Sequence, residues 1–394
     1  MFNEKMIALG SNRSVIRELF EFGKKFASEK GAENVFDFSL GNPNVPAPEE
    51  VRNALIDLAK IPDSTKLHGY TSAPGDGETL KKIASGINDR FKVGITPSEI
   101  YMTCGAAASL TITLRALSTP GDNFIVFAPY FPEYKVFIEG AGAEVRVVTA
   151  GENMSLNLDE LKETIDENTK GVIINSPNNP SGVVYSEEQI KTLCGILGSE
   201  SKKFGRPIFL ISDEPYREIV YDGTTVPYPM HYYDDVVICY SYSKSLSLPG
   251  ERIGYIAVSP KAYEKEKLYY AICGAGRVSG FVCAPSTYQK VIARCDGLTG
   301  DIAAYKRNRD LICDALNKYG YEFVKPQGAF YLFVKSLEED ANAFSDKAKK
   351  FGLLLVPSDT FGVKGYVRIS YCVDYDMIKR SLDKFKALKE SYEL

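Results

Sequence analysis

The middle of the chain, from about residue 100 to residue 290, alternates short apolar runs rich in β-formers with helical patterns. The runs are NFIVFA, AEVRVV, GVIINS, PIFLIS, VVICYS and RIGYIAV, and segments such as SEEQIKTLCGILGSESKKFG lie between them. Strands that are apolar nearly throughout and are separated by helices are typical of a mostly parallel sheet covered on both faces. The sequence therefore predicts an α/β fold for this part of the chain.

Three of these runs end in unusual polar clusters. NSPNNPSG follows GVII, SDEPY follows IFLI, and SYSK follows VVICY. In open α/β sheets, ligands bind in the crevice beyond the carboxyl ends of the strands. We therefore expect a ligand site that draws on the segments from Asn175 to Lys244.

The two ends of the chain differ from this middle part. NRSVIRELFEFGKKFASEKG near the start predicts a helix, with Ser11 or Asn12 as its cap. Near the end, a helix-rich segment is followed by the short strand patterns GAFYLFV and GYVRISYC. A chain of 394 residues exceeds one ordinary small domain. We expect a large domain over 46–290 and a smaller α+β domain formed by 1–45 and 291–394.

Composition and charge exclude several classes of protein. The net charge of −4 and the pI near 5.6 argue against a nucleic-acid-binding surface. The first residues have no apolar signal-peptide core, and no run of about 18 apolar residues occurs, so we expect a cytoplasmic protein that does not span a membrane. With only two histidines, His68 and His231, and no C-x-x-C pair among eight cysteines, we expect no metal site.

The stretch SYSKSLSLPGERIG, residues 241–254, surrounds one lysine with serines and follows it with an arginine. A solvated loop lysine is the commonest fate of a single lysine. The whole spacing, however, resembles the lysine-attachment signature of class I and II aminotransferases, which carry pyridoxal 5'-phosphate on a lysine. The resemblance implies that Lys244 binds the cofactor covalently and that Ser241 and Arg252 bind its phosphate. Hydroxyl donors and a permanent cation suit a phosphate.

Other segments resemble this family's cofactor pocket. By resemblance, Asp213 in LISDEPYREIVY binds the pyridine nitrogen, and Tyr216 and Asn179 bind the ring's phenolic oxygen, with Asn175 lining the pocket less directly. A carboxylate at the nitrogen keeps the ring protonated, so that it accepts electrons from the substrate.

Two further segments complete the expected pocket. MTCGAAASLTITLRAL resembles the phosphate-binding turn, so the backbone N–H groups of Gly105, Ala106 and Ala107 would cradle the phosphate at a helix N-terminus. This sequence departs from the family in lacking the polar residue often found near Ala107. Phe131 occupies the position whose aromatic ring stacks on the cofactor.

Three residues match substrate-binding or shared positions of the family. Arg368 lies in a strand pattern between Val and Ile, where a charge is costly without a partner, and would hold the substrate carboxylate. Gly41 would contact the same carboxylate through its N–H group. Tyr70 would reach the phosphate of a neighbouring subunit, which implies a homodimer. Arg277 is a candidate second cation for a dicarboxylate substrate, although a solvated loop arginine is the commoner case.

The resemblance covers nearly the whole chain and implies a fold type I enzyme. We expect an aminotransferase that moves the amino group of aspartate or another common L-amino acid to a 2-oxo acid such as 2-oxoglutarate, with ping-pong kinetics. A carbon–sulfur β-lyase and a decarboxylase of the same fold remain open, because they use the same cofactor residues. A cofactor-sensing regulator is a distant alternative, because it needs an added DNA-binding domain.

Overall fold

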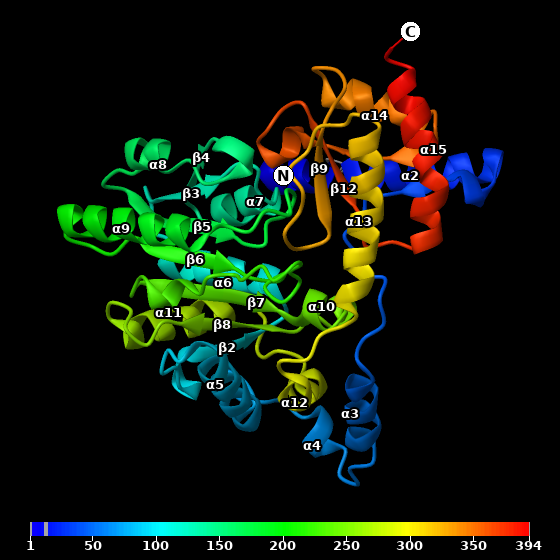
Figure 1. Cartoon of the computed structure of the whole chain (residues 1–394). Coiled ribbons are helices and arrows are strands. Elements are labelled where there is room, and N and C mark those ends of the chain that lie inside the picture. The colour runs from blue at the N-terminus through cyan, green and yellow to red at the C-terminus, as the bar shows by residue number, and fades with distance from the viewer. Residues whose placement is uncertain (1, 12–14, 394) are drawn as a thin grey trace. The chain divides into compact units, whose positions relative to one another are not determined.

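The computed structural model describes residues 2–11 and 15–393 (Figure 1). Contacts divide the chain into two units, and each is described separately below. The larger unit holds Val45–Ile302 and Gln327–Ala329. The smaller unit holds Met1–Asn44, Ala303–Pro326 and Phe330–Leu394.

The main boundary lies about a dozen residues later than the predicted end of the large domain at residue 290. Helix α12 (Ser286–Cys295) is responsible, because it packs on α3 (Glu49–Ala59) and α5 (Gly77–Phe91). Residues 291–302 therefore belong to the larger unit. That this unit binds the cofactor stays a prediction.

The larger unit is built on a seven-stranded sheet in the order β2-β8-β7-β6-β5-β3-β4. Strand β8 runs antiparallel to both of its neighbours, and the other pairs are parallel, so the predicted mostly parallel sheet is confirmed. The strands are β2 (Ile100–Thr103), β3 (Asn123–Phe127), β4 (Glu144–Val148), β5 (Thr169–Asn175), β6 (Phe209–Asp213), β7 (Val236–Ser241) and β8 (Gly254–Val258).

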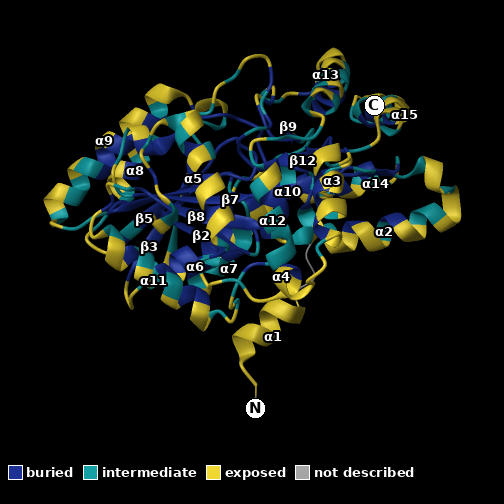
Figure 2. Ribbon diagram, turned by 90° about the horizontal axis from the view of Figure 1, so that it is seen from below, coloured by how far each residue is buried: buried dark blue, intermediate teal, exposed yellow. Residues whose placement is uncertain are grey.

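Helices cover this sheet because its central strands are apolar on both faces. Every residue of β3, β6, β7 and β8 is buried, and Figure 2 shows the strands in dark blue. Alternate residues such as Val126, Ile211 and Cys239 form one core with side chains of α6, α7 and α11. The remaining helices of this unit with their bounds are α4 (Thr65–His68), α6 (Ala106–Leu117), α7 (Glu133–Gly140), α8 (Leu158–Thr164), α9 (Glu187–Phe204), α10 (Tyr242–Ser245) and α11 (Lys265–Val278).

The smaller unit is an α+β arrangement. An antiparallel sheet has the order β11-β12-β9, and β1 pairs with β10 in parallel. Its strands are β1 (Phe36–Asp37), β9 (Tyr331–Lys335), β10 (Leu353–Leu354), β11 (Val356–Pro357) and β12 (Tyr366–Ser370). Its helices are α1 (Glu4–Ser11), α2 (Val15–Lys30), α13 (Ile302–Lys318), α14 (Ala341–Lys349) and α15 (Tyr375–Glu390).

The helix predicted near the start is present as α2, which is described from Val15 to Lys30. The proposed cap Ser11 is the last residue of α1, a helix that buries none of its residues. The proposed cap Asn12 lies outside the described residues.

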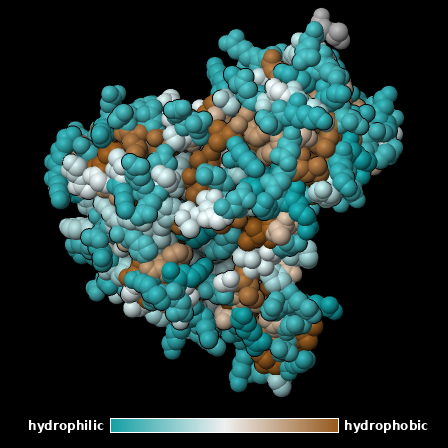
Figure 3. Space-filling model, in the orientation of Figure 1, coloured by the Kyte–Doolittle hydropathy of each residue, from teal (hydrophilic) through white to brown (hydrophobic). Residues whose placement is uncertain are grey.

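The face of the molecule seen in Figure 3 is mostly hydrophilic, with hydrophobic side chains in separate patches. Within residues 2–11 and 15–393, no helix is at once long enough and apolar enough to cross a membrane.

Candidate active site

The carboxyl ends of three neighbouring parallel strands, β5, β6 and β7, bring the predicted polar clusters together. Asn175 pairs with Asp213 across β5 and β6, and Asp213 pairs with Cys239 across β6 and β7. Strand β7 then ends at Ser241, and α10 with Lys244 follows directly. The polar residues predicted to line a ligand crevice therefore lie at the ends of adjacent strands.

Asp213 is a buried carboxylate with one oxygen in use and one available. Its side chain is 4% exposed, and Oδ2 accepts a hydrogen bond of 2.6 Å from the hydroxyl of Tyr134. Oδ1 has no hydrogen-bond partner among the described residues. Burial raises the pKa of Asp213 to about 7, because a charge is poorly solvated there. A carboxylate in this position favours a cationic N–H donor on its open oxygen.

Tyr134 is a site residue that the sequence analysis did not assign. It is buried at the start of α7, seven residues after β3 ends, and burial beside Asp213 raises the pKa of its hydroxyl well above the ordinary value. Its neighbour Phe131 was assigned from the same segment. An aromatic residue one helical turn after Phe131 was the available signal, and only the fold shows that it meets Asp213.

Asn175 links the ends of β5 and β6. Its Nδ2 donates to the backbone oxygen of Asp213 at 2.9 Å, and its Oδ1 accepts from the backbone N–H of Asn179 at 2.7 Å. Asn179 and Tyr216 are both 5% exposed. Asn175 therefore fixes the turn that carries Asn179 against the strand that carries Asp213.

Lys244 lies in the short helix α10, which Ser241 caps. The Ser241 hydroxyl accepts from the backbone N–H of Ser243 at 3.2 Å and lies 2.7 Å from the Ser243 hydroxyl. Arg252 Nη1 donates to that same Ser243 hydroxyl at 3.4 Å and to the backbone oxygen of Pro249 at 3.0 Å. Two hydroxyls and a guanidinium therefore converge beside the lysine.

The turn before α6 lies against this group. Gly105 has a φ of 90°, and a Cβ at this position would lie 2.8 Å from Nη2 of Arg252. Ala106 and Ala107 form the first turn of α6, a twelve-residue helix. The positive end of a helix dipole, a guanidinium and two hydroxyls together make an anion-binding site. The turn therefore lies against Arg252, the residue that the family resemblance assigns to the cofactor phosphate.

Phe131 lies between β3 and α7 and is half-buried. Its ring packs edge-on against Tyr134 with the ring centroids 5.7 Å apart. It also packs against the core cluster of the larger unit. Through Tyr134, Phe131 belongs to the same group of side chains as Asp213.

Gly41 and Arg368 of the smaller unit both lie beside Tyr331. Arg368 on β12 is 4% exposed and donates from Nη2 to the backbone oxygen of Ser39 at 2.7 Å. Its guanidinium lies 4.7 Å from the centre of the Tyr331 ring. A Cβ at Gly41 would overlap the Tyr331 hydroxyl, so any larger residue there would require the Tyr331 ring to shift. One tyrosine therefore brings together the two residues expected to bind a carboxylate.

Tyr70 and Arg277 lie outside these groups. Tyr70 is 88% exposed in the segment between α4 and α5. Arg277 is exposed in the last turn of α11. The single chain gives neither side chain a place in the cluster around Asp213 and Lys244.

The chain resembles known proteins over nearly its whole length. Residues 33–385 match the family model for aminotransferases of class I and II. The chain belongs to this family. An aspartate aminotransferase from Thermotoga maritima is 31% identical over 364 residues, which cover 91% of this chain and 92% of that protein. A probable N-acetyl-LL-diaminopimelate aminotransferase from Bacillus subtilis is 29% identical over 90% of this chain and 89% of that one.

A solved structure covers the aminotransferase completely. The amino transferase from Eubacterium rectale is 56% identical, and the alignment spans 100% of both chains with a TM-score of 0.98. The protein is therefore a fold type I enzyme that depends on pyridoxal phosphate.

Two features of this structure fit that cofactor. The open Oδ1 of Asp213 suits a protonated ring nitrogen, and the group formed by Arg252, the two serine hydroxyls and the Gly105 turn suits a phosphate. Lys244 directly follows Ser243, which belongs to the second of these groups. The residues present thus offer complementary partners for both charged ends of the cofactor.

Proposed function

We propose that this aminotransferase moves the amino group of a common L-amino acid, aspartate first among the candidates, to a 2-oxo acid such as 2-oxoglutarate. The observation that carries the proposal is the buried carboxylate of Asp213, which has one open oxygen and lies on the strand next to the one that leads to Lys244. The aspartate aminotransferases among its relatives support aspartate as the donor.

The proposed cofactor contacts follow the geometry of the larger unit. Asp213 holds the ring nitrogen, and Tyr216 and Asn179 hold the phenolic oxygen. Ser241, Arg252 and the N–H groups of residues 105–107 would hold the phosphate, and Phe131 would supply an aromatic ring for the cofactor ring to stack on. Tyr134 bonds to the Asp213 carboxylate and Asn175 bonds to the Asp213 backbone oxygen, so both the side chain and its backbone are held before any ligand arrives.

Bound pyridoxal phosphate supplies an electron sink that stabilises the negative charge formed when a bond at the substrate Cα breaks. With the cofactor bound, the amine of Lys244 would be the base that takes the proton from the substrate Cα and carries it to the acceptor atom. The amino group would stay with the enzyme when the first 2-oxo acid leaves, and a second 2-oxo acid would accept it. This order gives ping-pong kinetics.

Arg368 is the proposed partner of the substrate α-carboxylate, with Gly41 supplying a backbone N–H group. The guanidinium already lies over the Tyr331 ring and bonds to Ser39, so it enters the reaction with few accessible rotamers. A carboxylate held at two points orients the Cα–H bond relative to Lys244. Arg277 stays a candidate for the distal carboxylate of a dicarboxylic substrate.

The proposed assembly is a homodimer with shared sites. Tyr70 supports it, because a tyrosine that is 88% exposed in one chain offers its hydroxyl to a second copy. The partner's phosphate is the proposed ligand of that hydroxyl.

The first test is spectroscopic. The visible absorbance band of bound cofactor is recorded for the wild type, for Lys244→Ala and for the exposed control Lys261→Ala, and single amino acids are then added. We expect the wild type and Lys261→Ala to show a band that L-aspartate converts stoichiometrically, with oxaloacetate released. Lys244→Ala should not show that band, because it lacks the amine that binds the cofactor covalently.

Other outcomes would reassign the function. Pyruvate and ammonia formed from cystathionine, with no amino acid converting the band, would indicate the carbon–sulfur lyase. Carbon dioxide release would indicate the decarboxylase. If no band forms with added pyridoxal phosphate, the assignment of Lys244 is wrong.

A further inference from the structure

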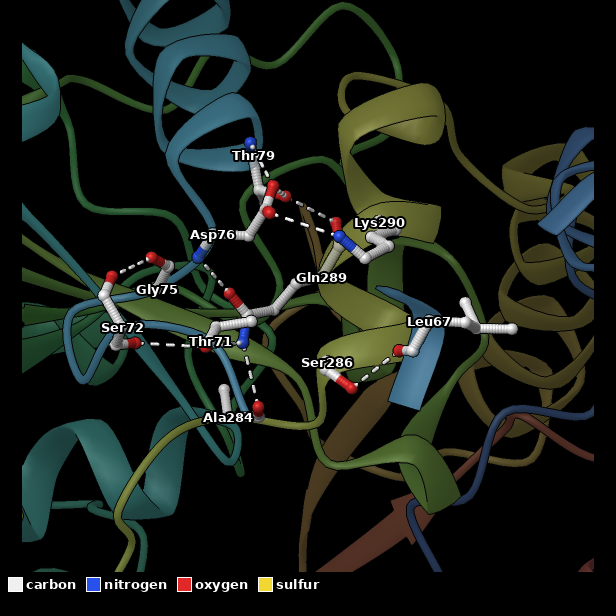
Figure 4. Close-up of polar contacts among 10 residues, drawn as sticks. All are labelled: Leu67, Thr71, Ser72, Gly75, Asp76, Thr79, Ala284, Ser286, Gln289 and Lys290. Atoms are coloured by element: carbon white, nitrogen blue, oxygen red, sulfur yellow. Dashed lines mark hydrogen bonds and ion pairs between the residues drawn. The ribbon is translucent and has the colours of Figure 1, made fainter. Parts of the chain in front are cut away.

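Gln289 on α12 is a buried polar residue that the reaction proposed above does not use. It is 0% exposed, and both ends of its amide are bonded (Figure 4). Oε1 accepts from the backbone N–H of Asp76 at 2.6 Å. Nε2 donates to the backbone oxygen of Ala284 at 2.8 Å and to the hydroxyl of Thr71 at 3.2 Å. A buried amide with this set of partners fixes its neighbours in one arrangement.

The bonds of α12 reach the segment 67–76 on both sides of Tyr70. Before Tyr70, the Ser286 hydroxyl donates to the backbone oxygen of Leu67 at 2.9 Å. After Tyr70, Gln289 contacts Thr71 and Asp76 (Figure 4). Tyr70 lies between these fixed points in the sequence and is 88% exposed, and its neighbours His68, Gly69, Ser72 and Ala73 are exposed as well.

The far end of the segment is held by further contacts. Asp76 caps α5 by accepting from the backbone N–H of Thr79 at 3.0 Å, and Lys290 Nζ lies 3.2 Å from the Asp76 carboxylate. The Thr79 hydroxyl donates to the backbone oxygen of Gln289 at 3.0 Å. A Cβ at Gly75 would lie 3.1 Å from Oε1 of Gln289, so the backbone passes close to that amide. The first turns of α5 and α12 thus hold the segment as one piece.

We propose that Gln289 is a positioning residue for Tyr70. It orders the segment 67–76 before the subunits meet, so that the Tyr70 hydroxyl is presented in the orientation that binds the partner's phosphate. The inference rests on the role given to Tyr70 in the proposed function. It adds that α12, which contacts no ligand in that proposal, sets the affinity for the cofactor.

The test measures how fast pyridoxal phosphate leaves the purified holoenzyme, because a structural role alone would not couple this rate to Tyr70. The variants are Gln289→Met, which keeps the shape and removes the amide, Tyr70→Phe, and the double variant. Asn88→Leu is the matched control, since the Asn88 amide bonds to both backbone groups of Ile95 in the same unit. We expect cofactor loss to be about tenfold faster in Tyr70→Phe and several-fold faster in Gln289→Met.

The double variant shows whether Gln289 acts through Tyr70 or independently of it. If Gln289 acts through Tyr70, the double variant loses cofactor no faster than Tyr70→Phe, whereas independent effects would multiply. Multiplying effects, or an equal effect of Asn88→Leu, would overturn the inference. If Gln289→Met does not fold, Thr71→Val replaces it in the test. This variant changes a half-exposed residue and removes only the hydrogen bond between Gln289 and the Thr71 hydroxyl. An unchanged rate in Tyr70→Phe would overturn the role of Tyr70 and the positioning role together. A faster rate in Tyr70→Phe alone would overturn only the positioning role.

Discussion

At the scale of the residue, Asp213 shows how the fold prepares a charge before its partner is present. The sequence places an aspartate at the end of an apolar strand, and the structure buries it with Tyr134 on one oxygen. The cost of this burial appears in the pKa, which rises to about 7 from 3.8. The raised pKa makes a prediction for stability that needs no substrate.

Cofactor-free wild-type protein should lose stability relative to Asp213→Asn as the pH rises from about 4 to about 7. The native state holds a proton on Asp213 in this window and the unfolded state does not, so unfolding releases a proton and becomes easier at higher pH. The difference in the free energy of unfolding should change by on the order of 2–4 kcal/mol across the window. Urea unfolding at a series of pH values measures it.

Two comparisons check the cause of that trend. Addition of pyridoxal phosphate should remove most of this pH dependence, because a protonated ring nitrogen at Oδ1 of Asp213 would stabilise the ionised carboxylate. Asparagine still accepts the hydrogen bond of Tyr134, so the variant isolates the charge. A pH-independent difference between the two proteins would show that Asp213 ionises normally in the folded state.

At the scale of the element, the turn from β2 into α6 combines two constraints on one glycine. Gly105 adopts a φ of 90°, which is unfavourable for other residues, and it leaves room for the guanidinium of Arg252. The first constraint concerns the energy of the backbone conformation, and the second concerns the anion site. Comparing alanine substitutions at Gly105 and at a second glycine with a similar φ measures the two effects separately.

Gly105→Ala and Gly121→Ala should destabilise the fold similarly but differ in cofactor affinity. Both glycines have φ values near 90°, and each substitution should cost about 1–2 kcal/mol of unfolding free energy. Only at Gly105 would the new Cβ displace Arg252, because nothing lies within 4 Å of a Cβ at Gly121. Binding of pyridoxal phosphate should therefore weaken about tenfold or more in Gly105→Ala alone.

Titration of both cofactor-free variants with pyridoxal phosphate measures their cofactor affinities, and thermal unfolding measures their stabilities. Equal affinities in the two variants would show that Arg252 does not hold the phosphate through this turn.

At the scale of the whole molecule, the proposed site needs a residue from a second copy of the chain. Lys244 and Tyr70 both belong to the larger unit, and Tyr70 is 88% exposed. A shared site predicts that two defective chains can repair one another.

Mixing Tyr70→Ala with Lys244→Ala under conditions of subunit exchange should restore activity. In a mixed dimer, one site has Lys244 from the first chain and Tyr70 from the second, so random exchange should give about a quarter of the wild-type sites. Transaminase activity measured during exchange tests this. If activity never exceeds that of the separate variants, Tyr70 acts within its own chain or not at all.

The sequence by itself determined the α/β fold and the family, and it predicted the site residues. Near-continuous apolar strands between helices require a covered parallel sheet, and the spacing around Lys244 is specific enough to indicate the cofactor. These signals are local, because each lies within one run of the chain. The roles of Lys244, Arg252 and Arg368 stay predictions for the experiments above.

Only the tertiary structure decided which distant side chains meet. The bond from Tyr134 to Asp213 joins residues 79 positions apart, and that from Gln289 to Asp76 joins residues 213 apart. The end of the larger unit near residue 302 depends on the packing of α12 against α3 and α5. No pattern along the chain encodes such contacts, because strand order and helix packing set them through the burial of the whole core.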